Sequence, residues 1–345
     1  MNSTFYDCDA LTSIDVNSFN VNKVNNASAM FGSCENLVTI YCDKTWNIST
    51  TQNMFGRSTK LKSHNLSYNS NKTDGDMANP YTGYFTPSNL QIELANDADN
   101  SSATTKYAGM QVAKVTLTGR TFYHDGKWNT LCLPFNVASF TGTPLAGATV
   151  REIDVEGTYN GKKTGFDAET GTLYLYFKEA VTSIVAHKPY IVMWDDGDAN
   201  TIDNPEFTSV TIVSGSASSV NSEDGKVSFA GTYSYQKFNS EDNSILLLGG
   251  DNSLYYPKAN ASIGAQRAFF QLHDITAGTP TSSVRSFVMN IDDSDATGLK
   301  EVTTPLASGE GNGNEAWYSL DGRKLSGKPA QKGVYIHEGR KVVMP

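Results

Sequence analysis

Three related stretches near the start of the chain decide the fold: FYDCDALTSIDV (residues 5–16), FGSCENLVTIYC (residues 31–42) and FGRSTKLKSHN (residues 55–65). Their first residues are 26 and 24 positions apart, and the first two copies carry aliphatic residues three positions apart. This period and spacing are typical of a leucine-rich-repeat-like solenoid, in which each coil adds one short strand. The recurring structural positions are Phe5, Cys8, Leu11, Ile14, Phe31, Cys34, Leu37, Ile40, Phe55 and Leu61.

The array is expected to end with its third copy. His64 stands there where the first two copies have an isoleucine, and no fourth copy follows. We therefore assign residues 1–66 to the solenoid. The first coil begins at Phe5 without an amphipathic cap, which would leave an apolar end open to water. From this we expect the closing part of a longer repeat protein, with a signal peptide that lies upstream or has been removed.

Cys8 and Cys34 occupy equivalent positions in adjacent coils, and two interpretations of them are open. Stacked cysteines of this kind could lie within disulfide range. Free cysteine is also a common small core residue, and we interpret the pair as buried thiols without a redox role. With Cys42 and Cys132 the chain has four cysteines, spaced too irregularly for a disulfide framework or a CxxC zinc site.

The repeat resembles a known family. Its pattern, Met-Phe-x-x-Cys-x-x-Leu-x-x-Ile/Leu-Asp followed by VNSFNVNKVNNASAMF (residues 16–31), is similar to the BspA-type leucine-rich repeats of bacterial surface proteins. The resemblance covers residues 1 to about 64 and departs from the family at Val16 and Asn17, where Leu-Ser is usual. It implies an exported, surface-attached protein that adheres to host matrix proteins or to other cells.

Composition favours strands over helices. Only 18% of the residues are charged, and Asn, Ser, Thr, Gly and Tyr, which suit strands and turns, take their place. No segment gathers Lys and Arg densely enough to bind nucleic acid, and the net charge is −9. No run of 18 apolar residues is present, so we expect no transmembrane span. The sequence predicts a mainly β protein.

Two further regions follow the repeats. Residues 67–105 are polar and acidic, and we predict a linker with one strand at 91–94. Residues 106–298 contain many short β-branched or aromatic runs, such as TLYLYF (172–177) and KPYIVMW (188–194), separated by Gly, Pro, Asp or Asn. This spacing predicts a β-sandwich or jelly roll, either one large domain or two small ones.

The β-domain and the tail each carry a resemblance. Phrases such as LTGRTFYHDGKWNTLCLPFNV (117–137) and SLYYPKANASIGAQRAFFQL (253–272) resemble a β-domain of exported Bacteroides-type proteins, over about 112–292. Residues 299–315 are a predicted linker, and residues 316–345 form a predicted module of two β-hairpins, with turns at Asp321-Gly322 and Glu338-Gly339. Within it, YSLDGRKL and KGVYIHEGRKVV resemble the last part of type IX sorting domains, which implies a place outside the cell or on the outer membrane.

Catalytic and metal-binding motifs are missing from the sequence. The five histidines are scattered, and there is no HExxH, no G-x-S-x-G and no Gly-rich phosphate loop. Cys132 lies in an apolar run and is interpreted as a structural thiol. Asp196, Asp198 and Asn200 alternate like the start of a calcium loop, but no glutamate follows at the twelfth position. A solvated loop is therefore preferred, and no metal, cofactor or catalytic residue is assigned.

Three functions remain open. The first is a non-catalytic adhesion protein of a Gram-negative bacterium that recognises host or neighbouring-cell proteins, its binding residues unknown. The second is a glycan-binding or polysaccharide-capture protein that uses the β-domain. A solvent-facing row of aromatic residues in that domain would support this function. The third is a glycan-acting enzyme, which needs two carboxylates about 5–10 Å apart in a cleft. The first is preferred, and the protein is not expected to be an enzyme.

Overall fold

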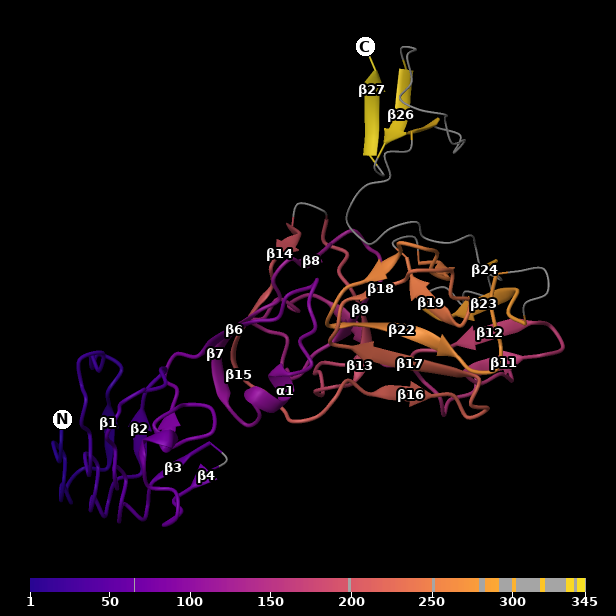
Figure 1. Ribbon diagram of the computed structural model, residues 1–345. Coiled ribbons are helices and arrows are strands. Elements are labelled where there is room, and N and C mark those ends of the chain that lie inside the picture. Colours follow the sequence, from indigo (N-terminus) through magenta and orange to yellow (C-terminus); the bar gives the residue numbers. More distant parts are fainter. Residues whose placement is uncertain are drawn as a thin grey trace.

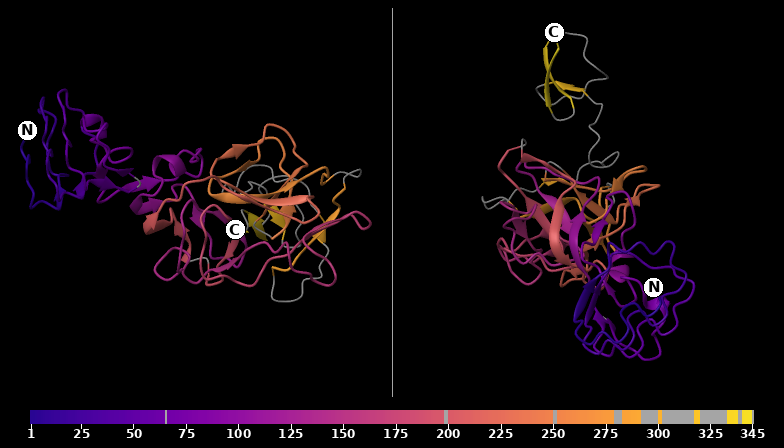
Figure 2. Two further views of the ribbon diagram at one scale, coloured as in Figure 1. Left: turned by 90° about the horizontal axis from the view of Figure 1, so that it is seen from below. Right: turned by 90° about the vertical axis from the view of Figure 1, so that its left-hand side faces the viewer.

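The computed structural model describes residues 1–64, 66–197, 200–249, 252–278 and 283–291, and the backbone of strands at 300–301, 317–319, 333–337 and 340–344. Strands account for 33% of the structure and helices for 3%, which confirms the mainly β prediction. The N-terminal repeats lie at one end, and a larger β region follows them (Figures 1 and 2). In the described part of the chain, no helix has the length and apolar character to cross a membrane.

The N-terminal region is built on a parallel sheet in the order β1-β2-β5. Its strands are β1 (Ser13–Asp15), β2 (Thr39–Tyr41) and β5 (Phe85–Thr86). Ile14 pairs with Ile40, so these two aligned repeat positions are direct neighbours in the sheet. On its other side Ile40 pairs with Phe85, which follows the three copies. The third copy instead forms a small antiparallel pair, β3 (Lys62–Ser63) with β4 (Leu66–Ser67), before the 3-10 helix η1 (Gly75–Met77).

Successive copies of the repeat lie on one another through their backbones. The amide of Phe5 donates to the carbonyl of Met30 (2.9 Å), and the amide of Phe31 donates to that of Met54 (2.8 Å). The chain also turns at residues with positive φ that recur with the repeat, at Ser3, Ala29 and Asn53 and again at Asp7, Ser33 and Arg57. The turns on either side of the recurring Phe therefore have the same backbone conformation in all three copies.

Residues 67–105, predicted as a linker, are divided between the two regions. Met77, Ala78, Tyr84 and Phe85 are buried in the same core as Phe31. The strand β6 (Gln91–Glu93) and the short helix α1 (Ala103–Lys106) belong to the next region, where β6 pairs in parallel with β7. The stretch is polar in composition, but its few apolar residues cover the last repeat, whose apolar side would otherwise face water.

The larger β region contains eighteen further strands among the described residues. Their bounds are β7 Gln111–Thr116, β8 Thr121–Phe122, β9 Asn129–Cys132, β10 Thr149–Arg151, β11 Gly165–Asp167, β12 Thr172–Leu175, β13 Pro189–Met193, β14 Ile202–Asp203, β15 Glu206–Thr211, β16 Ser219–Asn221, β17 Val227–Thr232, β18 Gln236–Lys237, β19 Ile245–Leu248, β20 Leu254–Tyr255, β21 Ser262–Ile263, β22 Arg267–Leu272, β23 Ser286–Met289 and β24 Lys300–Glu301. The main sheets run β15-β7-β6, β10-β13-β9, β11-β12-β23-β24 and β16-β17-β22-β19-β20. Two pairs, β6 with β7 and β12 with β23, are parallel.

Two buried cores flank the sheet β10-β13-β9. Along β13, Tyr190 and Val192 belong to a core shared with β7 and β15, whereas Ile191 belongs to a core shared with β12, β17 and β22. Alternate side chains of a strand point to opposite faces of its sheet, so β13 carries apolar side chains on both faces of the sheet. This explains why KPYIVMW is a continuous apolar run rather than an alternating one.

The C-terminal strands pair with one another. They are β25 (Trp317–Ser319), β26 (Gly333–His337) and β27 (Arg340–Met344), in an antiparallel sheet of that order. The pairing of His337 with Arg340 fits the hairpin expected around residues 338–339. The predicted first hairpin at Asp321-Gly322 and the linker 299–315 lie outside the described residues, apart from β24.

Candidate functional site

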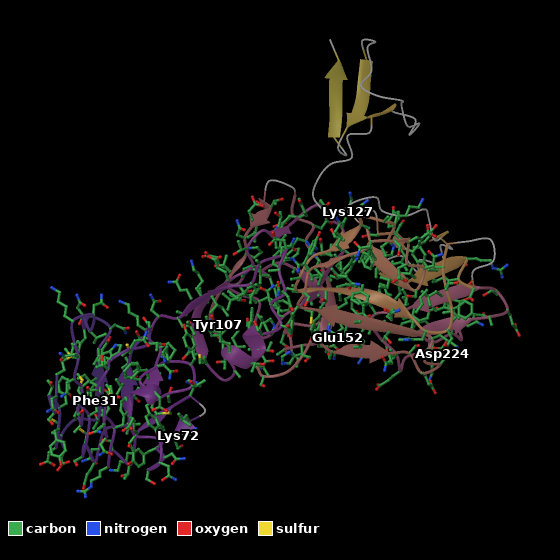
Figure 3. The ribbon with its side chains drawn as sticks, in the orientation of Figure 1. Phe31, Lys72, Tyr107, Lys127, Glu152 and Asp224 are labelled. Carbon is green, nitrogen blue, oxygen red and sulfur yellow. The ribbon has the colours of Figure 1, made fainter. Side chains whose placement is uncertain are left out.

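The repeat aromatics form a stacked ladder in the N-terminal core. The ring of Phe31 lies 5.6 Å from that of Phe5 at an interplanar angle of 3°, and 5.8 Å from that of Phe55 at 9°. Phe31 and Phe55 are fully buried, whereas Phe5 is half-buried at the first coil. Figure 3 labels Phe31 in the N-terminal region. Stacked rings at these separations are favourable beyond the area that they bury.

At the aligned position of Cys34 and Ser58, the side chain donates a hydrogen bond to the preceding copy of the repeat. The thiol of Cys34 donates to the carbonyl of Phe5 (2.9 Å), and the hydroxyl of Ser58 donates to the carbonyl of Phe31 (2.5 Å). The equivalence of cysteine and serine at this position therefore has a physical reason. Cys8 and Cys34 are both free thiols, but only Cys34 is buried, whereas Cys8 is half-buried. Burial raises the pKa of Cys34.

At the aligned position of Leu11, Leu37 and Leu61, a backbone hydrogen bond closes a turn in each copy. The amides of Leu11, Leu37 and Leu61 donate to the carbonyls of Cys8, Cys34 and Ser58 at 3.0, 3.1 and 3.0 Å. Leu37, Ile40 and Leu61 are buried, and Leu11 and Ile14 are half-buried in the first coil. His64, which replaces the isoleucine of the first two copies, is exposed.

The outward side of β1, β2 and β5 is polar and open, and we call it the strand face. It consists of the side chains of Ser13, Asp15, Thr39, Tyr41 and Thr86, which alternate with the inward Ile14, Ile40 and Phe85. Asp15, Tyr41 and Thr86 form one row across the three strands. Tyr41 is 37% exposed, so this row presents an aromatic ring beside a carboxylate.

A hydrogen-bond network fixes the strand face at its end. The side chain of Asn17 donates to the hydroxyl of Ser88 (2.7 Å) and accepts from the amide of Asp43 (2.7 Å). The carboxylate of Asp43 in turn accepts from the amides of Ser88 (2.7 Å) and Asn89 (3.1 Å). These bonds join segments that follow β1, β2 and β5, so the face is held as one surface.

Cys132 is built into the packing of the β region. It is fully buried and donates to the carbonyl of His187 (3.1 Å). Burial raises the pKa of its thiol to about 12, which keeps the thiolate from forming at neutral pH. His187 in turn hydrogen-bonds Tyr233 (2.7 Å). This arrangement supports a structural thiol rather than a nucleophile.

The candidate calcium loop can be followed in part. Asp196 hydrogen-bonds Nδ1 of the buried His124, and the side chain of Asn200 donates to the Asp196 carbonyl (2.8 Å). Asp198 lies outside the described residues. Within the described ranges, no group of three His, Cys, Asp or Glu side chains could hold a metal ion.

Carboxylates gather at a cavity of about 570 Å³ between the ends of β11 and β12 and the turn after β16. Asp167 binds Lys162 (2.7 Å), and this hydrogen bond lowers the pKa of the Asp167 carboxyl group. Asp224, labelled in Figure 3, accepts from the amide of Phe166 (2.7 Å) and the hydroxyl of Ser222 (2.5 Å). A glycosidase acid needs a raised pKa, and the pKa of Asp167 is shifted the other way.

Most aromatic residues that the sequence offered for sugar stacking lie inside the fold. Trp46, Trp128 and Trp194 are at most 4% exposed, and the side chain of Trp317 is outside the described part. Tyr256 and Phe270 are buried, and Tyr255 and Phe269 are half-buried. Within the described part of the chain, the exposed tyrosines are Tyr6, Tyr41, Tyr123 and Tyr235, and the first two belong to the N-terminal region.

No protein-family model, no curated protein and no solved structure matches the chain. The functional conclusion therefore depends on the residues and on their geometry.

Proposed function

We propose that this chain is a non-catalytic binding protein of a Gram-negative bacterial surface, and that it adheres to host or neighbouring-cell proteins through the strand face. In this proposal residues 1 to about 64, with their covering segment, form a leucine-rich-repeat-like solenoid of the BspA type. The β-domain, of a sandwich or jelly-roll kind, acts as a spacer or second module. The C-terminal strands serve in anchoring, at the outer membrane or in the extracellular space.

The observation that carries the proposal is the in-register pairing of Ile14 with Ile40 and of Ile40 with Phe85. Because side chains alternate along a strand, this pairing puts Asp15, Tyr41 and Thr86 in one outward row. Exposed tyrosine is enriched at protein interfaces, since it offers a large rigid area and a hydroxyl group. The surrounding hydroxyl and carboxylate groups suit the polar rim of such an interface.

The test uses the full chain against an array of fibronectin, laminin, collagen and purified polysaccharides. Tyr41→Ala is expected to weaken binding to a retained protein about tenfold or more, as for a central interface tyrosine. Asp15→Arg is expected to weaken it further by placing a positive charge in the same row. Tyr6→Ala is the matched control, because Tyr6 is 49% exposed but lies outside the strand face.

Protein binding that is equal in Tyr41→Ala and Tyr6→Ala would remove the strand face from the mechanism. Deleting only residues 1–66 is a poorer test than these substitutions. It would uncover Met77, Tyr84 and Phe85, which are buried against the repeats, and the exposed apolar surface would bind proteins unspecifically.

A further inference from the structure

A second candidate surface lies on the β region, far along the chain from the strand face. It is a groove of about 540 Å³ over the sheet strands β16, β17 and β22. The residues that line it are Ser219, Asn221, Gly225, Ser228, Ala230, Phe269, Gln271 and His273. Its volume is within the usual range for small-ligand sites.

The groove is hollow because of the residue sizes across the sheet. Ser219, Ala230 and Phe269 form one row across the three strands, and Asn221, Ser228 and Gln271 form the next. The middle strand β17 supplies the two small residues, Ser228 and Ala230, at 5% and 8% exposure. They form the floor, and the longer side chains of β22 form one wall. The other face of β17 carries Val227 and Phe229, which anchor it in the core.

The walls offer the hydrogen-bonding side chains of Asn221, Gln271 and His273. Asn221 is exposed, and its amide can both donate and accept. Gln271 donates through Nε2 to the carbonyl of Ser244 (3.0 Å), so its amide oxygen is the atom left for a ligand. Nε2 of His273 is hydrogen-bonded to the hydroxyl of Ser228 (2.6 Å), which fixes the imidazole ring and leaves Nδ1 for a partner.

One side of the groove is apolar and rigid. Phe269 is half-buried and packs against the cluster of Phe238, Ile245, Leu247, Ala261 and Ile263. Its ring position is therefore fixed before any ligand arrives, and together with Ala230 it gives an apolar contact area. Preorganised groups of this kind reduce the entropy lost on binding.

The charge of the lining distinguishes this groove from the cavity at Asp167. The eight lining residues include no Asp, Glu, Lys or Arg, whereas the other cavity is lined by Lys162, Lys163, Asp167 and Glu223 among others. The nearby Lys226 and Asp274 pair with each other (3.5 Å). With no carboxylate, ammonium or guanidinium group in the lining, the groove suits an uncharged molecule that makes many hydrogen bonds.

We propose that this groove binds a short stretch of an uncharged oligosaccharide. Sugar hydroxyl groups donate and accept, and so match the amide groups of Asn221 and Gln271 and the ring nitrogen of His273. The apolar face of a sugar ring would lie against Phe269. This binding site is independent of the proposed protein adhesion, which uses the strand face.

The experiment is native electrophoresis of the full chain through gels that contain laminarin, yeast mannan or galactomannan, with hyaluronan and heparin as charged comparators. Oligosaccharides from a retarding polysaccharide are then titrated by calorimetry. Asn221→Ala is expected to weaken binding about fivefold to tenfold, the effect of one hydrogen bond. Ala230→Leu fills the floor and is expected to abolish binding. Asn239→Ala is the control, because Asn239 is exposed and does not line the groove.

Retardation by an uncharged polysaccharide that Asn221→Ala weakens and Asn239→Ala leaves unchanged supports the proposal. Retardation by hyaluronan or heparin alone, or by none of the five, overturns it. Equal binding of the Asn221→Ala and Asn239→Ala proteins also overturns it. Thermal unfolding of every variant checks its fold. If Ala230→Leu unfolds, Asn221→Ala still decides, since its side chain is exposed and has little effect on stability.

Discussion

Replacing Phe31 by alanine tests whether the ring ladder holds the N-terminal repeats together. Phe31 is fully buried and stacks on Phe5 and Phe55 at 5.6 and 5.8 Å. Loss of the buried ring costs about 1.5–3 kcal/mol of transfer free energy, and each aromatic pair adds about 0.5–1.5 kcal/mol. The coils on both sides are fixed by backbone hydrogen bonds and cannot close the cavity. We expect the Phe31→Ala substitution to cost about 3–5 kcal/mol in all.

The same substitution at Phe5 is the matched control. Phe5 also stacks on Phe31, but it is half-buried at the first coil, so it loses less transfer free energy and leaves no closed cavity. About 1–2 kcal/mol is expected for Phe5→Ala.

Hydrogen exchange of the full chain, followed by mass spectrometry, measures the local free energy of opening. A tenfold rate change corresponds to about 1.4 kcal/mol. Amides of β2 and of residues 50–58 should therefore exchange about a hundredfold to a few thousandfold faster in Phe31→Ala, and only about fivefold to thirtyfold faster in Phe5→Ala. Amides of β17 and β22 should not change, because they belong to another core. Equal effects of the two substitutions would refute the ladder as the main source of stability.

Three more predictions follow from single contacts. Cys34→Ser should cost less than about 1 kcal/mol because serine keeps the donor to Phe5, whereas Cys34→Val should cost about 1–2 kcal/mol more by the same exchange measurement. Gly83→Ala should destabilise the N-terminal core by about 1–3 kcal/mol in that assay, since a Cβ would lie 2.1 Å from the Met77 carbonyl; unchanged exchange contradicts this. The thiol of Cys132 has a pKa of about 12 in the folded protein, against 9.0 for an ordinary cysteine. The folded state therefore holds this proton more tightly than the unfolded state does. Its contribution to the free energy of unfolding should be fully present below pH 9 and fall above pH 9 by about 1.4 kcal/mol per pH unit. In urea titrations from pH 8 to 10.5 the loss of stability should be smaller in Cys132→Ala than in the wild type by this slope, while the other buried thiols with a raised pKa, such as Cys34, still contribute.

The repeat could be recognised in the sequence because its main contacts join residues that are one repeat apart. Phe31 contacts Phe5 and Phe55, which lie one repeat away, and the Phe and Leu positions perform the same task in each of the three copies. The equivalence of Cys34 and Ser58 needed the structure, since only the coordinates show that both donate to the carbonyl of a phenylalanine in the preceding coil.

The cover over the last repeat was harder to predict. Residues 67–105 read as a polar linker, and their buried residues Met77, Tyr84 and Phe85 are separated by polar ones without a period of 2 or 3.6. Strand β5 is two residues long, too short to produce a pattern. It exists because β2 offers an unpaired parallel edge, and an unpaired edge is satisfied by whatever backbone is brought beside it.

By itself the sequence determined the mainly β class, the presence of three related copies near the start of the chain, and most of the longer strands, because these depend on side-chain patterns within a few residues. Only the tertiary structure decided which faces are open. The apolar run of β13 became a strand buried on both sides, and the small residues Ser228 and Ala230 became the floor of a groove, because sheets far apart in the chain pack on one face and leave the other in water. Burial is a property of the whole packing, and no local pattern contains it.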